Sequence, residues 1–246
     1  MSVFFLGTCR AYDVARLMNR RRIKVFSPVR RFLSPRQILQ YVQHMRGKPY
    51  WYGPTTIHLL SPEVFEEIQN GQSVEGAISE LNDLRSKWPE ARAFVIEIAA
   101  IKEFMMTALG RPFACAKFVH NRIDDEIVEI IPTESEVLDT LRQIRDLLGG
   151  RPVVWMAYAA PTVDVDPHIP ANRDKIAKLL HRHAHRFGDG FVDPQPIVEE
   201  YGQSAFFKDW RGNLDHYTAI GLRQVTNLVQ AELDRSARDF APGEAV

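Results

Sequence analysis

Cysteine is scarce in this chain of 246 residues, and neither sign of charge is in excess. Two cysteines, Cys9 and Cys115, are too few for the disulfide framework of a small secreted protein. The 31 basic and 31 acidic residues balance, so net charge gives no argument for binding nucleic acid or a membrane surface. No apolar run approaches the roughly 18 residues of a membrane span. These absences predict a soluble protein with no membrane span and no nucleic-acid partner.

The first residues also lack the pattern of a secretory signal. The apolar run at 3–6 is too short for such a signal, and no basic segment precedes it. A reducing compartment is the ordinary setting for a chain with so few cysteines. We therefore expect a cytoplasmic protein whose two thiols are reduced.

Apolar runs alternate with segments of helical spacing along the chain. The continuous apolar runs at 93–99 and 152–160 suit parallel strands covered on both faces. This order predicts an α/β protein, a three-layer α/β/α sandwich around a central, mostly parallel sheet of about five strands. The predicted strands are 3–6, 23–26, 93–99, 152–160 and 191–193. The predicted helices lie within 2–20, from Ser34, from Ser61 to about 70, and at 74–87, 134–148, 172–187 and 218–233.

We expect one domain over residues 1–246, because no repeat or low-complexity linker interrupts the alternation. The pattern is least regular over 104–131, which we interpret as an insertion or lid that contains a small hairpin. The tail at 236–246 has little apolar content and is expected to be frayed.

Two segments are expected to meet at the carboxyl ends of the strands, where open parallel sheets bind ligands. One is Gly7-Thr8-Cys9-Arg10, directly after the first strand, and the other is Asn213-Leu214-Asp215-His216-Tyr217-Thr218, before the last helix. The dipole of a helix favours the thiolate of a cysteine at its start. A neighbouring imidazole would favour it further and serve as general base. We therefore predict Cys9 as nucleophile and His216 as base.

The two motifs together resemble the SGNH (GDSL-like) hydrolase superfamily. In that family a Gly-Asp-Ser turn after the first strand carries the nucleophile, and an Asp-x-x-His block before the last helix carries the base. Cys9 and His216 stand at those positions. The chain is most similar to the branches with cysteine in the turn, namely GSCFA-type proteins and the Gly-x-Cys proteins of capsule polysaccharide biosynthesis.

The resemblance implies an SGNH or flavodoxin-like fold and a reaction through a Cys9 thioester. The expected reaction is acyl transfer or the hydrolysis of an ester or thioester. A small molecule or a glycan, such as a polysaccharide precursor, is the implied substrate, and coenzyme A is an expected acyl donor. No other cofactor and no metal is required.

A base needs a partner that fixes its tautomer. Asn213 stands at the family's offset, Asp215 carries charge, and Asp209 is a third candidate, so the partner of His216 stays open. The backbone N–H of Cys9 is the expected first oxyanion donor. A second donor is expected either from the loop after Ala99-Ala100 or from the turn Ala160-Pro161-Thr162.

Further polar residues near the predicted strand ends are candidates for binding substrate. Glu97 lies inside a predicted buried strand and needs a partner there, with Lys102 as one candidate. Arg10 adds positive potential beside Cys9. The candidate substrate-binding residues are Thr8, Arg10, Glu97, Thr162 and Tyr217.

The segment 16–36 is notably basic, with arginines at 16, 20–22, 30, 31 and 36 and a lysine at 24. It predicts either a solvated helix face or a docking surface for anionic groups. The anionic partner would be coenzyme A, a carrier protein or an acidic glycan.

Two other functions are compatible with the same residues. One is a non-catalytic SGNH-like binding module, which the absence of a Gly-x-Asn-Asp segment and the Asn213 substitution favour. The other is a metal-dependent hydrolase that uses Asp164, Asp166 and His168 in the loop after a central strand.

Overall fold

The computed structural model describes residues 1–27, 34–47, 74–106, 113–115, 127–209 and 213–239. Five parallel strands form the central sheet in the order β2-β1-β3-β7-β8. This order confirms the predicted three-layer α/β fold with a parallel sheet. The strands are β1 (Ser2–Leu6), β2 (Lys24–Phe26), β3 (Ala93–Ile98), β7 (Val153–Ala157) and β8 (Gly190–Val192).

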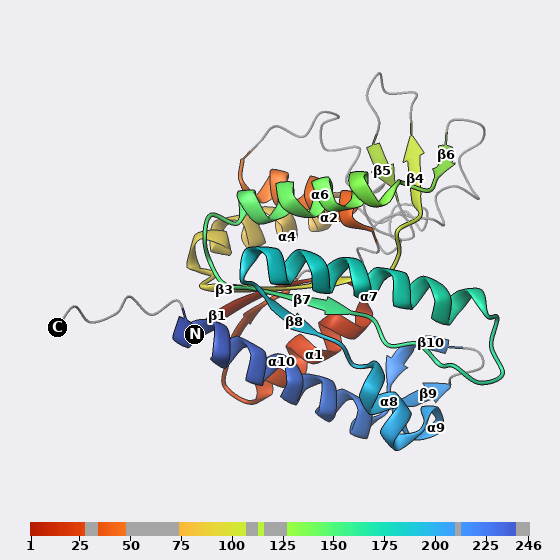
Figure 1. The fold of residues 1–246 in the computed structure, drawn as a ribbon. Helices are drawn as coiled ribbons and strands as arrows, with labels where there is room; N and C mark the ends of the chain where they lie inside the picture. The colour runs from red at the N-terminus through yellow and green to blue at the C-terminus, as the bar shows by residue number, and fades with distance from the viewer. Residues whose placement is uncertain (28–33, 48–73, 107–112, 116–126, 210–212, 240–246) are drawn as a thin grey trace.

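Helices cover both faces of this sheet (Figure 1). On one face lie α2 (Pro35–Met45), α4 (Val74–Lys87), α6 (Glu134–Leu147) and α7 (His168–Phe187). On the other face lie α1 (Cys9–Arg20) and α10 (Ala219–Asp239). The shorter helices are α8 (Gln195–Tyr201), α9 (Gln203–Phe206) and a 3-10 helix, Trp88–Glu90.

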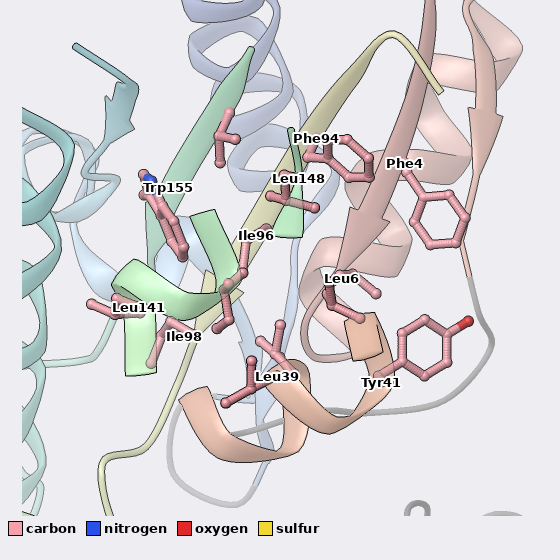
Figure 2. Close-up of a cluster of buried hydrophobic side chains, with 14 of the residues drawn as sticks. Phe4, Leu6, Leu39, Tyr41, Phe94, Ile96, Ile98, Leu141, Leu148 and Trp155 are labelled. Atoms are coloured by element: carbon pink, nitrogen blue, oxygen red, sulfur yellow. The ribbon is translucent and has the colours of Figure 1, made fainter. Parts of the chain in front are cut away.

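The central strands divide their side chains between two apolar cores. Phe4 and Leu6 of β1 pack under α2 and α6, as Figure 2 shows, whereas Val3 and Phe5 pack under α1 and α10. Successive residues of a strand point to opposite faces, so a strand covered twice must be apolar throughout. Each large apolar side chain buried in this way contributes about 1.5–3 kcal/mol to stability.

Two small antiparallel sheets stand on the side towards which β3 and β7 point (Figure 1). One has the order β5-β4-β6, from Phe113–Cys115, Glu103–Met106 and Ile127–Ile130. The sequence predicted a hairpin here, and the described residues instead form three strands. The other pairs β9 (Phe207–Asp209) with β10 (Asn213–Tyr217). The segment before the last helix is therefore a strand.

Two further predictions need correction. Helix α10 continues to Asp239 and buries Ser236, so the chain is helical up to that residue and the predicted frayed tail cannot begin at 236. Helix α7 begins at His168, earlier than predicted, because Asp166 accepts the His168 N–H at 2.9 Å.

The helix predicted from Ser61 lies outside the described residues. Within those residues, no helix combines the length and apolar character needed to cross a membrane.

A buried histidine makes the stability of this fold depend on pH. His183 of α7 is 2% exposed and lies edge-on to Trp155. Burial, with help from the positive charges of Arg145 and Arg186, lowers the pKa of His183 from 6.5 to about 4. Between these pH values the unfolded state binds a proton at His183 and the native state does not. The contribution of His183 to the free energy of unfolding is therefore fully present above pH 6.5 and is lost as the pH drops towards 4.

We expect His183 to account for about 2 kcal/mol of lost unfolding free energy between pH 7 and pH 5. Urea unfolding at the two pH values measures it. His183→Leu should lose this part of the pH dependence, whereas His185→Leu, at an exposed site on the same helix, should keep it. Equal pH dependence in the two variants would refute the assignment.

Candidate functional site

The turn between β1 and α1 is shaped by Gly7. Its φ angle is +153°, and a Cβ at this position would lie 2.6 Å from the Cβ of Glu97. No other residue fits without displacing β3, so the glycine is required by close approach. Thr8 then caps α1, because its hydroxyl accepts the N–H of Arg10 at 3.2 Å. Cys9 follows as the first residue of the helix and is partly exposed.

The side chain of Glu97, from β3, holds this turn in place. Its fully buried carboxylate accepts the Thr8 N–H at 2.9 Å and also accepts the Thr8 hydroxyl. The other oxygen lies 3.3 Å from Nε of Arg10, which is itself buried. Arg10 donates to the carbonyl of Ala159 at 3.0 Å, and its guanidinium lies 5.1 Å from the centre of the Tyr158 ring. This network joins the ends of β1, β3 and β7.

Three predicted substrate-binding residues are therefore engaged with one another. Thr8, Arg10 and Glu97 are all buried, and their polar groups hold the turn instead of facing a ligand. Lys102 is not the partner of Glu97, because it pairs with Glu129 at 2.7 Å. We name these three residues the turn clamp. It fixes where α1 begins and hence where the Cys9 thiol stands.

His216 approaches the start of α1 from β10. Its Nδ1 lies 3.3 Å from Oδ2 of Asp13. Asp13 is one helical turn after Cys9, so both project from the same face of α1. The side chains are 34% and 23% exposed for His216 and Asp13 respectively, so solvent and substrate can reach them. With Nδ1 facing the carboxylate, Nε2 is the nitrogen left for proton transfer.

The residue that faces Nδ1 was not among the sequence predictions. Asp13 lies there, whereas the expected partners were Asn213, Asp215 and Asp209, whose side chains lie outside the described part of the structure. Asn213 and Asp215 lie on β10, where Asn213 pairs with Asp209 of β9. The sequence prediction considered only residues near the histidine and therefore missed Asp13. The signal that could have identified Asp13 is its position, because it is a carboxylate four residues after the candidate nucleophile.

The other two predicted substrate-binding residues, Tyr217 and Thr162, lie in different surroundings. Tyr217 is buried against Phe206 and Phe207, and burial raises the pKa of its phenol. It supports the strand beneath His216. Thr162 is exposed, but its N–H donates to Oε1 of Gln203 at 3.0 Å.

The hydrogen bond from Thr162 to Gln203 limits where the second oxyanion donor can come from. The N–H of Ala160 is also used, by Gln195 at 3.0 Å, and Pro161 has none. The turn at 160–162 therefore offers no spare donor, and the loop after Ala99-Ala100 is the remaining candidate of the two.

The part of the chain that the structure describes does not support the metal-dependent alternative. Among the described residues, no group of three or more His, Cys, Asp or Glu side chains is placed to hold a metal ion. Asp166 accepts a backbone N–H at the start of α7. Asp164, Asp166 and His168 thus do not form the metal site that was one of the alternatives.

The basic segment 16–36 is spread over several elements. Arg21 donates to Asn227 at 2.9 Å, Lys24 pairs with Glu90, and Arg36 pairs with Glu103 at 2.7 Å. Residues 28–33 lie outside the described part. Within it, these three side chains have protein partners, and Arg16, Arg20 and Arg22 are exposed.

The chain is similar to known proteins in part of its sequence and in its fold. A family model described as the TviD N-terminal domain matches residues 112–227. LAE5, an α/β hydrolase enzyme from the metagenome of Lake Arreo in Spain, is 12% identical. The match covers 95% of this chain and 94% of that chain, with a TM-score of 0.51. This likeness shows a shared fold.

A second solved structure is a mutant of Axe2, an acetyl-xylooligosaccharide esterase from Geobacillus stearothermophilus. It is 12% identical with a TM-score of 0.47, and the match covers 94% of this chain and 93% of that chain. The search of curated proteins finds no match.

The turn clamp leads to a stability prediction. Glu97→Gln keeps the shape of the side chain but leaves the buried Arg10 without its counter-charge. We expect a loss of about 3 kcal/mol in unfolding free energy, as is usual when one partner of a buried ion pair is removed. Glu90→Gln breaks the exposed pair with Lys24 and should cost less than about 1 kcal/mol. Equal losses in the two variants, measured by urea unfolding, would contradict the role of the clamp.

Proposed function

We propose that this protein is an acyltransferase or an ester or thioester hydrolase that acts through a thioester on Cys9. The observation that carries the proposal is the contact between His216 Nδ1 and Asp13, one helical turn from Cys9. A nucleophile, a base and a residue that orients the base are the three parts that nucleophilic catalysis needs. The hydrolase-like fold supports the same reading.

In the first half-reaction, Nε2 of His216 takes the proton from the Cys9 thiol. The thiolate attacks the carbonyl carbon of the donor, a C–S bond forms, and the carbonyl electron pair moves to oxygen. The carbonyl then re-forms, and the leaving alkoxide or thiolate departs with the proton from His216. Asp13 stabilises the imidazolium in between, and the start of α1 favours the thiolate.

In the second half-reaction, His216 takes a proton from water or from an acceptor hydroxyl. The oxygen attacks the thioester carbon, the C–S bond breaks, and the Cys9 thiolate recovers the proton from His216. Hydrolysis and transfer differ only in which hydroxyl attacks. The Cys9 N–H is the proposed first oxyanion donor, and the Ala99-Ala100 loop is proposed to give the second.

The substrates are proposed from the motif resemblance. Coenzyme A thioesters are the proposed donors, and a hydroxyl of a glycan or polysaccharide precursor is the proposed acceptor. The steps above require no other cofactor.

The pH dependence of Cys9 alkylation tests the proposal. Iodoacetamide labelling, read site by site by mass spectrometry, should give a midpoint below the ordinary thiol value of about 8.5. The midpoint should rise in His216→Ala and, to a smaller extent, in Asp13→Asn. Cys115 in the same digests is the internal reference and should not respond to either change. A Cys9 that is inert, or indifferent to His216, would favour the binding module instead.

Turnover of a thioester donor gives an independent prediction. Cys9→Ala should abolish turnover, and His216→Ala should lower kcat by about 10²–10⁴ because the general base is lost. Asp13→Asn should lower it less, by at least about tenfold, because the base remains but is no longer held and charge-compensated. Asp139→Asn, an exposed change on α6, is the matched control. Full turnover in Cys9→Ala would contradict the proposed mechanism.

A further inference from the structure

A cavity of about 280 Å³ opens at the carboxyl edge of the central sheet. Its wall includes the loop after β3, at Ala99, Ala100 and Ile101, together with Phe104 of β4 and Ile176 of α7. Its volume is close to the lower end of the range for small-molecule sites, roughly 300–1,000 Å³. The proposed mechanism uses the backbone of the Ala99-Ala100 loop as an oxyanion donor, but none of its steps uses the space that the wall encloses.

The cavity and the Cys9 turn lie at the same edge of the sheet and are linked through Tyr158. Tyr158 forms part of its wall, and the same ring lies 5.1 Å from the guanidinium of Arg10, the residue after Cys9. Ala99 and Ala100 follow β3, which pairs with β1 up to Leu6. The cavity lies beside α2 and α7, whereas His216 contacts α1 on the opposite face. The base and the cavity therefore lie on different faces of the sheet at its carboxyl edge.

Several of the polar groups in the wall already have protein partners, and Asn172 and Lys175 add an amide and an amine to it. Ser34 and Gln37 bond to each other in the capping box of α2. Glu103 accepts from Arg36 at 2.7 Å, and Lys102 pairs with Glu129. What the wall offers an entering ligand is mainly hydrocarbon, which suits an apolar chain.

We propose that this cavity holds the acyl chain of the donor, so that the substrate class is esters or thioesters of linear aliphatic acids longer than acetate. This inference rests on the proposed function of Cys9. Each methylene that enters should strengthen binding about threefold to fourfold until the cavity is full.

Two measurements separate this inference from the proposed function. The first is binding of decanoate to Cys9→Ala, followed by calorimetry, which requires no chemistry at the thiol. We expect saturable binding that weakens at least tenfold when Ile176→Trp fills the cavity. Ala171→Phe, at an exposed position of α7 outside the wall, is the matched control and should leave binding unchanged.

The second is kcat/KM for acylation of Cys9 by coenzyme A thioesters of two to ten carbons. We expect kcat/KM to rise with chain length. The ratio of octanoyl to acetyl should fall at least tenfold in Ile176→Trp, and the preferred length should increase in Ile176→Ala. Decanoate that does not bind, or a length profile that neither variant changes, would overturn the cavity assignment. If decanoate binds but no donor acylates Cys9, the proposed function fails and the cavity remains an aliphatic-chain site.

Discussion

The buried ion pair between Glu97 and Arg10 is the constraint on which the carboxyl edge of this protein depends. Removing two charges from water is costly, and the attraction between them compensates only where the remaining polar groups are also satisfied. Here Thr8 donates twice to the carboxylate, and the guanidinium meets the Ala159 carbonyl and the face of Tyr158. Three strand ends are thereby held in one arrangement, and α1 begins on top of it.

In the proposed mechanism, substrate binding and proton transfer are divided between the two faces of the sheet. Cys9 and Asp13 come from α1, and His216 comes from β10, which packs against α1. The cavity lies at the same edge but beside α2 and α7. The residues that would choose a substrate are therefore separate from those that would move its protons, and each set can change without displacing the other.

Most of the layers could be predicted from the sequence, because a strand buried on both faces must be apolar throughout. The run at 93–98 shows this, and the helix at 74–87 has the predicted bounds. The β9–β10 pair was not predicted, because the sequence 207–217 lacks the alternation of apolar and polar residues that is typical of strands. These segments pair as strands only in the context of the folded protein. Cys9 and His216 could be named from local motifs. The carboxylates could not be assigned, since sequence does not show that Glu97 lies beneath Gly7 or that Asp13 reaches a histidine 203 residues away.

That separation along the chain has a consequence for biosynthesis. Chains grow from the N-terminus and fold as they emerge, so α1 and its thiol are made long before β10. In the proposed mechanism, the imidazole can therefore act on the thiol only after β10 has been synthesised and has paired with β9.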